Sequence, residues 1–300
     1  MIGKLEYFIA LARFRHFGRA AEECGVTQPT FSAAIRQLEE QLGVLLVKRG
    51  SRFQGLTPEG ERVLEWARRI VADARAMKEE MRTARDGLSG HIRIGVIPTA
   101  LAVVQRLTVP FCERHPDVSF TIRSATSEEI LAKLENFELD AGITYLEAEP
   151  LGRIQAISLA EERYYLVSAR NGPFAGRKSV TWKEAGSLEL CLLTRDMQNR
   201  RIVDRYLADA GVTVRSALES NSVIALLSHV MTGRWSSIMP GSLLDPFRSG
   251  GAFETIALTE PVGRQKLGLV TRVLDPATPL VSALLATARS IGQIGSNDDD

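Results

Sequence analysis

Residues 17–43 combine small side chains, a tight turn and a helix whose first turns carry short polar residues. Gln28, Thr30, Ser32, Ala33 and Arg36 are expected on the exposed leading side of a helix over residues 29–41. Gln can pair with adenine, Arg can pair with guanine or a phosphate, and Ala or Thr can touch a thymine methyl group. Short side chains also let a helix lie deep in the major groove. The pattern therefore favours a helix that reads DNA bases.

The residues before this helix suit a helix-turn-helix unit, in which a tight turn joins two helices and the second enters the major groove. Ala20 and Ala21 are small enough for the two helices to approach closely, and Gly25 supplies the turn. Thr27 is expected to cap the second helix and Pro29 to be its first residue, with the free N–H groups near a phosphate. A compact helical subdomain without a role on DNA would have similar features.

Residues 48–56 are predicted to form a basic hairpin that contains glycine. Such a wing can place Arg49 or Arg52 on the DNA backbone or in the minor groove. Arg49 has an alternative role as a structural ion-pair partner. Residues 1–60 hold eight Lys or Arg against six Glu, a net charge of +2, so the DNA hypothesis depends on where the basic residues lie and not on their number.

Residues 58–88 are predicted to form one long helix, with Thr57 as its cap and Pro58 as its first residue. Apolar residues recur along it with alternating spacings of four and three, which is typical of a helix that pairs with a second copy. They are Val63, Ala67, Ile70, Ala74, Met77, Met81, Ala84 and Leu88. An amphipathic helix that packs only on its own domain is the alternative. Glycines at 87 and 90 then suggest a hinge.

Strand and helix signals alternate over residues 91–300, which predicts parallel sheets with crossover helices. The length suits two small α/β subdomains, the first at about 91–161 and 266–300 and the second at about 162–265. The late strand and final helix are expected to return to the first subdomain, with a cleft between the two.

Other features of the sequence exclude several classes of protein. No apolar run reaches the roughly 18 residues that a membrane span needs. Cys24, Cys112 and Cys191 are odd in number and far apart, which indicates a reducing cytoplasm. The four histidines are scattered, and no nucleophile elbow, phosphate loop or dinucleotide fingerprint occurs. We therefore expect a cytoplasmic protein with no catalytic residues, no metal site and no cofactor.

Residues 1–88 resemble the winged helix-turn-helix domain and linker helix of the LysR-type transcriptional regulators. The resemblance rests on Phe8, Phe17, Ala20, Ala21, Val26, Thr27, Gln28, Pro29, Ser32, Ile35, Leu38, Glu39, Leu42, Gly43, Leu46, Arg49, Leu56, Thr57 and Gly60. In the second half it rests on Gly95, Pro116, Val118, residues 139–143, Gly233, Met239 and Pro240. It thus spans nearly the whole chain.

Several residues depart from the family pattern. His16 stands where Ser is usual, Cys24 where Leu is common and Val47 where Phe is common. Ala33 and Ala34 replace a polar pair that often contains Arg, which removes contacts to bases or phosphates. This last departure bears on the operator sequence and not on the class of protein.

The resemblance implies a C-terminal half with the fold of a periplasmic solute-binding protein and an effector in the cleft at the strand ends. The matching positions are Thr99, Thr126, Ser127 and Thr144 in the first subdomain, with Asn199 or Arg201, Asn221 and Ser222 in the second. Hydroxyls, amides and helix N-termini suit a small anion or a carboxylate. Each Thr or Ser has a local cap or turn as its alternative role.

The resemblance further implies a homodimer through residues 58–88, an inverted-repeat operator, and a tetramer that often bends the DNA. Contact with RNA polymerase is left open. A solute-binding protein without a DNA function is the main rival, and it leaves residues 1–88 unexplained.

Overall fold

A computed structural model of the chain describes residues 1–48, 50, 53–147, 154–213, 216–246, 251, 253–274 and 276–295. For residues 84, 86 and 292–295 only the backbone is described. The chain forms two compact units, Met1–Gly87 and Leu88–Asp300. Each unit has its own core of buried side chains.

The first unit contains α1 (Ile2–Phe14), α2 (Phe17–Glu23), α3 (Gln28–Leu42) and α4 (Pro58–Asp86). Gly25 takes a positive φ of 66° in the turn between α2 and α3, a conformation that favours glycine. α3 begins at Gln28, one residue earlier than predicted, so Pro29 is its second residue. Thr27 is the N-cap residue, but its hydroxyl contacts the Thr30 hydroxyl at 2.9 Å and makes no capping bond to an amide.

The segment after α3 forms hydrogen bonds with α3, with the far side of the predicted hairpin and with the start of α4. Val47 pairs with Leu56 in an isolated antiparallel bridge, which marks the base of the predicted hairpin. The Glu39 carboxylate of α3 accepts hydrogen bonds from the amides of Leu46 (2.8 Å) and Val47 (3.2 Å). At the start of α4, the Thr57 hydroxyl donates to a backbone carbonyl of this segment and its oxygen accepts from an amide of the first turn. Arg49 and Arg52, expected on the wing, lie outside the described residues.

The buried apolar side chains of the long helix α4 lie along one side of it. Leu64, Ala67 and Val71 are buried, where α4 packs against α1. Ala67 belongs to the predicted seam, whereas the other two lie beside it. Leu88, the last residue of that seam, lies beyond the end of the helix at Asp86.

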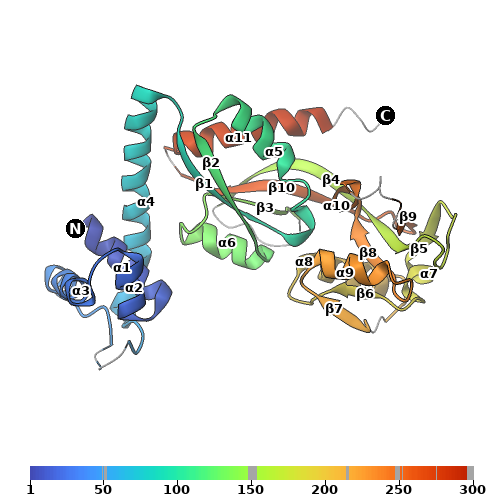
Figure 1. Ribbon diagram of the computed structural model, residues 1–300, viewed down its shortest axis with the longest axis horizontal. Coiled ribbons are helices and arrows are strands. Elements are labelled where there is room, and N and C mark those ends of the chain that lie inside the picture. The colour runs from blue at the N-terminus through green and yellow to red at the C-terminus, as the bar shows by residue number, and fades with distance from the viewer. Residues whose placement is uncertain are drawn as a thin grey trace. The chain divides into compact units, whose positions relative to one another are not determined.

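The second unit is built from strands and helices in alternation (Figure 1). Its elements are β1 (Gly90–Val96), η1 (Pro98–Ala100), α5 (Gln105–Arg114), β2 (Val118–Ser124), α6 (Ser127–Glu135), β3 (Ala141–Tyr145), β4 (Ile154–Ala169), β5 (Ser179–Thr181), α7 (Trp182–Gly186), β6 (Cys191–Leu193), α8 (Gln198–Asp209), β7 (Leu218–Ser220), α9 (Val223–Val230), β8 (Ser237–Pro240), α10 (Gly241–Leu244), β9 (Phe253–Thr259), β10 (Arg264–Arg272) and α11 (Pro279–Gly295).

The prediction of parallel sheets is right for some strands and wrong for others. β1 pairs in parallel with β2 and β3, and β6 pairs in parallel with β7. In contrast, β10 runs antiparallel to β3 and β4, and β4 runs antiparallel to β8 and β9. Parallel pairing needs a crossover connection, but β4 and β10 lie next to each other as two strands that cross the unit in opposite directions.

The strand β4 belongs to both halves of the unit. Its residues 154–163 pair with β10, and its residues 164–169 pair with β8 and β9. The first half holds β1, β2, β3, α5, α6 and α11, with α5 and α11 together on one side of the sheet and α6 on the other (Figure 1). The second half holds α7 to α10 with the short strands. In the described part of the chain, no helix is both long and apolar enough to cross a membrane.

Gly60 provides a test of the close packing between α4 and the base of the hairpin. A Cβ at this position would lie 2.1 Å from the Leu46 carbonyl oxygen, so Gly60→Ala forces the backbone apart. We expect a loss of about 1–3 kcal/mol in the free energy of unfolding, measured by urea unfolding followed by circular dichroism. Gly3→Ala is the matched control, because nothing lies within 4 Å of its added Cβ and helical Ala is favoured. Equal stability of the two variants would contradict the close approach.

Candidate functional site

One candidate site is the exposed start of α3. The side chains of Thr27, Gln28, Pro29, Thr30, Ala33 and Arg36 are exposed, and that of Ser32 is half-buried. The opposite side of the helix buries Phe31, Ile35 and Leu38 in the core of the first unit. The helix therefore presents one amide, three hydroxyls and one guanidinium to the outside while its apolar side holds it in place.

His16, which departs from the family pattern, has a local structural role. It is the N-cap residue of α2, and its Nδ1 accepts a hydrogen bond of 3.3 Å from the Arg19 amide. A serine hydroxyl can accept the same bond, so the substitution keeps the cap.

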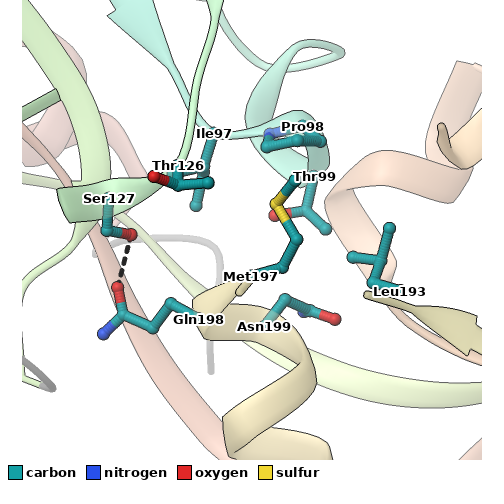
Figure 2. Close-up of a pocket in the computed structure, with 9 residues that line it drawn as sticks. All are labelled: Ile97, Pro98, Thr99, Thr126, Ser127, Leu193, Met197, Gln198 and Asn199. Atoms are coloured by element: carbon teal, nitrogen blue, oxygen red, sulfur yellow. Dashed lines mark hydrogen bonds between the residues drawn. The ribbon is translucent and has the colours of Figure 1, made fainter. Parts of the chain in front are cut away.

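A second candidate site is a pocket between the two halves of the second unit (Figure 2). A water-sized group has about 10 Å³ of free room in it, and the total of about 220 Å³ includes open solvent. Its lining comes from the end of β1 and η1, the start of α6, the end of β6 and the start of α8. The lining residues are Ile97, Pro98, Thr99, Thr126, Ser127, Leu193, Met197, Gln198 and Asn199. None of them carries a charge, so polar recognition here depends on hydroxyls and amides.

A chain of hydrogen bonds joins the two halves across this pocket. The Thr144 hydroxyl donates to Ser127 Oγ at 2.9 Å. The Ser127 hydroxyl in turn donates to Gln198 Oε1 at 2.5 Å (Figure 2). Gln198 is only 3% exposed, and its Nε2 has no hydrogen-bond partner within the described structure. A buried amide N–H without a partner is costly, so this side chain is held in the pocket wall by its bond to Ser127 at that cost.

The position of α8 is fixed by the buried guanidinium of Arg200. Its Nη1 donates to the Leu193 carbonyl at 2.7 Å and to Glu219 at 2.9 Å, and its Nε donates to Asp204 at 2.8 Å. These bonds hold the start of α8 against β6 and β7. They place the neighbouring Gln198 and Asn199 at the pocket.

The residues expected around an effector fall into three groups. Thr99, Thr126, Ser127 and Asn199 line the pocket. Thr144 lies behind Ser127 through the hydrogen bond above. Thr126 also forms a capping box at the start of α6, so its predicted local role is present as well.

The remaining expected residues lie away from the lining. Arg201 pairs with Glu128 of the other half at 3.6 Å, with both side chains exposed. Ser222 caps α9 by accepting from the Ala225 amide, and Asn221 is exposed. The helix start at residues 221–222 is therefore a local cap that does not contribute to this pocket.

A buried carboxyl lies directly behind the pocket. Glu162 of β4 is 2% exposed, and its Oε2 accepts a hydrogen bond of 3.1 Å from the Tyr145 hydroxyl. Its Oε1 accepts a hydrogen bond from the hydroxyl of Ser242 in α10. Desolvation by burial raises the pKa of Glu162 to about 7, although both hydroxyls lower it.

The Tyr145 hydroxyl connects this carboxyl to the pocket lining. It lies 3.2 Å from Thr99 Oγ1 and accepts a hydrogen bond of 3.1 Å from Asn199 Nδ2. Burial, and then the Glu162 carboxyl, raise the pKa of Tyr145, so its hydroxyl stays protonated. The same Asn199 amide donates to the Tyr164 hydroxyl at 3.4 Å.

Sequence reasoning missed Gln198, Tyr145 and Glu162. One signal for Glu162 was present, because it shares the buried face of β4 with Tyr164 and Leu166 at a spacing of two. Gln198 and Tyr145 each stand beside a residue that was identified, but their roles depend on contacts between distant segments.

The three cysteines lie outside the pocket. Cys191 is fully buried in β6, and burial raises the pKa of its thiol to about 11. Cys24 is half-buried in the first unit, and burial followed by the charges of Glu23 and Glu6 raises its pKa. Cys112 is half-buried on α5, and none of the three is in a disulfide. A reactive thiolate is therefore not part of the pocket lining.

Two family profiles match the chain. Residues 85–292 match the LysR substrate binding domain, which is more than half of the chain, and residues 2–61 match the bacterial regulatory helix-turn-helix protein of the lysR family. The chain belongs to the LysR family. This LysR-type protein is therefore a DNA-binding transcriptional regulator and not an enzyme, as the sequence predicted.

Curated relatives and solved structures agree with this assignment. The chain is 30% identical over 97% of its length to the DNA-binding transcriptional dual regulator OxyR of Escherichia coli K12, covering 94% of that protein. It is 30% identical over 90% of its length to a probable hydrogen peroxide-inducible genes activator of Mycobacterium avium, covering 88% of it.

Among solved structures, a full-length OxyR variant of Pseudomonas aeruginosa with a cysteine replaced by aspartate is similar with a TM-score of 0.77. It is 25% identical, with 96% of this chain and 94% of that one covered. Full-length CbnR in complex with its target DNA shares the fold, with a TM-score of 0.68, 24% identity and coverage of 97% and 99%. The regulator's fold is thus an N-terminal helix-turn-helix with a long helix and a C-terminal α/β substrate-binding domain.

The raised pKa of Glu162 predicts a pH dependence of stability. The folded state holds the Glu162 proton up to about pH 7, whereas the ordinary value is 4.5, so the contribution of Glu162 to stability is fully present below pH 4.5 and is lost as the pH rises through 7. Relative to Glu162→Gln, the wild type should lose up to about 3 kcal/mol of unfolding free energy across this window. Urea unfolding at a series of pH values measures it. The control is Glu161→Gln, an exposed neighbour paired with Arg264 at 2.6 Å, which should follow the wild type.

Proposed function

We propose that this regulator binds an inverted-repeat operator as a homodimer or a tetramer of two dimers, in the cytoplasm, and responds to a small effector in the pocket of its second unit. The functional segments are residues 1–57 for DNA, 58–88 for dimerisation and 91–300 for the effector. The single observation that carries the proposal is the exposed polar start of α3 in a chain that belongs to the LysR family.

The exposed side chains at the start of α3 support base reading. Gln28 can contact adenine, and Arg36 can contact guanine or a phosphate. Thr27, Pro29, Thr30, Ser32 and Ala33 complete the surface that would enter the groove. Arg49 and Arg52 are proposed for the backbone or the minor groove on the sequence alone.

The outward side of α4 supports pairing of two subunits. Ile70, Met77 and Met81 of the predicted seam are 40%, 59% and 62% exposed, and Trp66 is 62% exposed. Large apolar side chains so exposed along a single helix favour contact with a second copy of the same helix. Two helix-turn-helix units related by a two-fold axis require an operator with inverted symmetry.

The uncharged pocket supports a small effector held by hydroxyls and amides, with an anion or carboxylate as the first choice. Thr99, Thr126, Ser127 and Asn199 would contact it directly, together with Gln198. Thr144 supports Ser127 from behind, whereas Arg201, also predicted at the effector, is paired with Glu128 away from the lining. The starts of α6 and α8 both border the pocket, although a capping box already occupies the amides of Thr126 and Glu129 at the start of α6.

Peroxide sensing is a second candidate, because several relatives are named as activators of hydrogen peroxide-inducible genes. One solved relative, an OxyR of Corynebacterium glutamicum, is described as a cysteine mutant with peroxide bound. In this chain no cysteine lines the pocket, and Cys191 is buried with a raised thiol pKa. Reaction of a peroxide with a thiolate in the pocket is therefore not favoured, and reversible binding is the better proposal.

Gln28→Ala tests the role of α3. An operator selected from random duplexes by the wild-type chain should bind this variant about 5- to 150-fold more weakly, a loss of about 1–3 kcal/mol, because a bidentate contact to a base disappears. Fluorescence anisotropy measures this for the operator and for a scrambled duplex. Gln41→Ala, exposed in the last turn of the same helix, should bind like the wild type. An equal loss on both duplexes would remove the base-reading role of Gln28.

A double variant, Ile70→Glu with Met77→Glu, tests the role of α4. Both side chains are exposed in one subunit, so the changes should leave its fold intact but place like charges across a paired seam. Light scattering should show dissociation to a monomer or to a dimer held elsewhere. Lys78→Glu, on the charged flank, should keep the wild-type assembly. An unchanged mass for the double variant would show that this side of α4 pairs with nothing.

A further inference from the structure

The buried polar network behind the pocket has two alternative hydrogen-bond arrangements. With Glu162 ionised, the Tyr145 hydroxyl donates to the carboxylate and its oxygen accepts from Asn199 Nδ2 and from the Thr99 hydroxyl. All partners are satisfied. In this arrangement the Thr99 proton points away from the pocket, and Thr99 offers only lone pairs to a ligand.

Protonation of Glu162 at Oε2 allows the opposite arrangement. The new O–H donates to the Tyr145 oxygen, and the Tyr145 hydroxyl then turns to donate to Thr99 Oγ1. Thr99 no longer needs its own proton for Tyr145, so its O–H is free to point into the pocket. The proton comes from solvent, no other bond forms or breaks, and every group keeps a partner.

The charged groups around Glu162 favour this change. Among the described residues, its carboxyl accepts hydrogen bonds from the hydroxyls of Tyr145 and Ser242, and no Lys or Arg of this part of the chain is among the groups that shift its pKa. Asp245, just beyond α10, raises it through its negative charge, although Arg106 pairs with Asp245 at 3.4 Å. Gln265, which is uncharged, stands opposite on β10. The neutral form is therefore accessible near neutral pH.

Glu162 also lies close to the point where the two halves of the unit meet. It precedes by two residues the point where β4 changes partners from β10 to β8. Its two oxygens contact β3 of one half and α10 of the other. A change in its charge therefore alters hydrogen bonds to both halves and, through Tyr145, to the pocket.

We infer that Glu162 is a proton-linked positioning residue, which takes up a proton when an anion with a carboxylate-like acceptor binds in the pocket, so that the Thr99 hydroxyl can donate to that anion. This inference rests on the proposed effector pocket and adds its regulation by pH. By reciprocity, anion affinity falls as the pH rises, by up to tenfold per pH unit once Glu162 is ionised in the free protein. Neutral ligands of the same shape lack this dependence.

Infrared spectroscopy tests the inference on the full-length chain, because a protonated carboxyl has a C=O stretch that ionised carboxylates lack. The probe is acetate, with acetamide as its uncharged control. Ligand-free wild type should show this band at pH 6 and lose it by pH 8, and Glu161→Gln should behave in the same way. Glu162→Gln should lack the band. At pH 8, acetate should restore the band in the wild type, and acetamide should not.

Tyr145→Phe tests whether the hydrogen-bond link from Glu162 through Tyr145 to Thr99 is needed, or whether burial of Glu162 is sufficient. This variant should keep the protonated carboxyl at pH 6 but lose the effect of acetate at pH 8, because the link to Thr99 is gone. No band in the wild type, a band that persists in Glu162→Gln, or a band that acetate leaves unchanged would each overturn the inference. Operator binding measured on the same samples reports the proposed DNA function separately, so its failure is distinguishable.

Discussion

The pairing of β4 with two sets of partners is the constraint on which the second unit depends. One half of this strand hydrogen-bonds to β10 and the other half to β8 and β9. Because a single strand is shared, the two halves are joined at the point where its partners change. The pocket lies between the halves, and its groups come from both. A ligand that bridges Ser127 and Gln198 therefore acts on the same joint that β4 forms.

The sequence predicts the order of the elements well, because apolar periodicity and turn residues are local signals. It fails for β4 and β10, since strand direction depends on which distant segment lies alongside. For the pocket, the sequence prediction relied on the rule that polar residues at the ends of parallel strands lie close together. This rule is right for Thr99, Thr126 and Ser127, which all line the pocket. It cannot supply Glu162, whose neighbours come from residues 17 and 80 positions away. Asn221 and Ser222 also follow a strand directly, but they lie outside the lining, where Ser222 caps α9.

The seam of α4 illustrates a limit of periodicity as evidence. A heptad pattern says that one side of a helix is apolar, but not what covers it. Here α1 covers Leu64, Ala67 and Val71, so part of the apolar surface serves the regulator's own core. Ile70, Met77 and Met81 remain exposed within the unit. Only the structure divides the pattern into these two parts.

Hydrogen bonds to residues 45–47 couple α3 to α4. Glu39 of α3 holds the amides of Leu46 and Val47, while Thr57 at the start of α4 holds the carbonyl of Leu45. Gly60 lets the long helix touch this segment without an intervening side chain. These contacts leave little room for the two helices to move independently, so α3 is expected to follow a rotation of α4. If two subunits pair through α4 as proposed, a slight turn of this helix would change the spacing between their two DNA contacts.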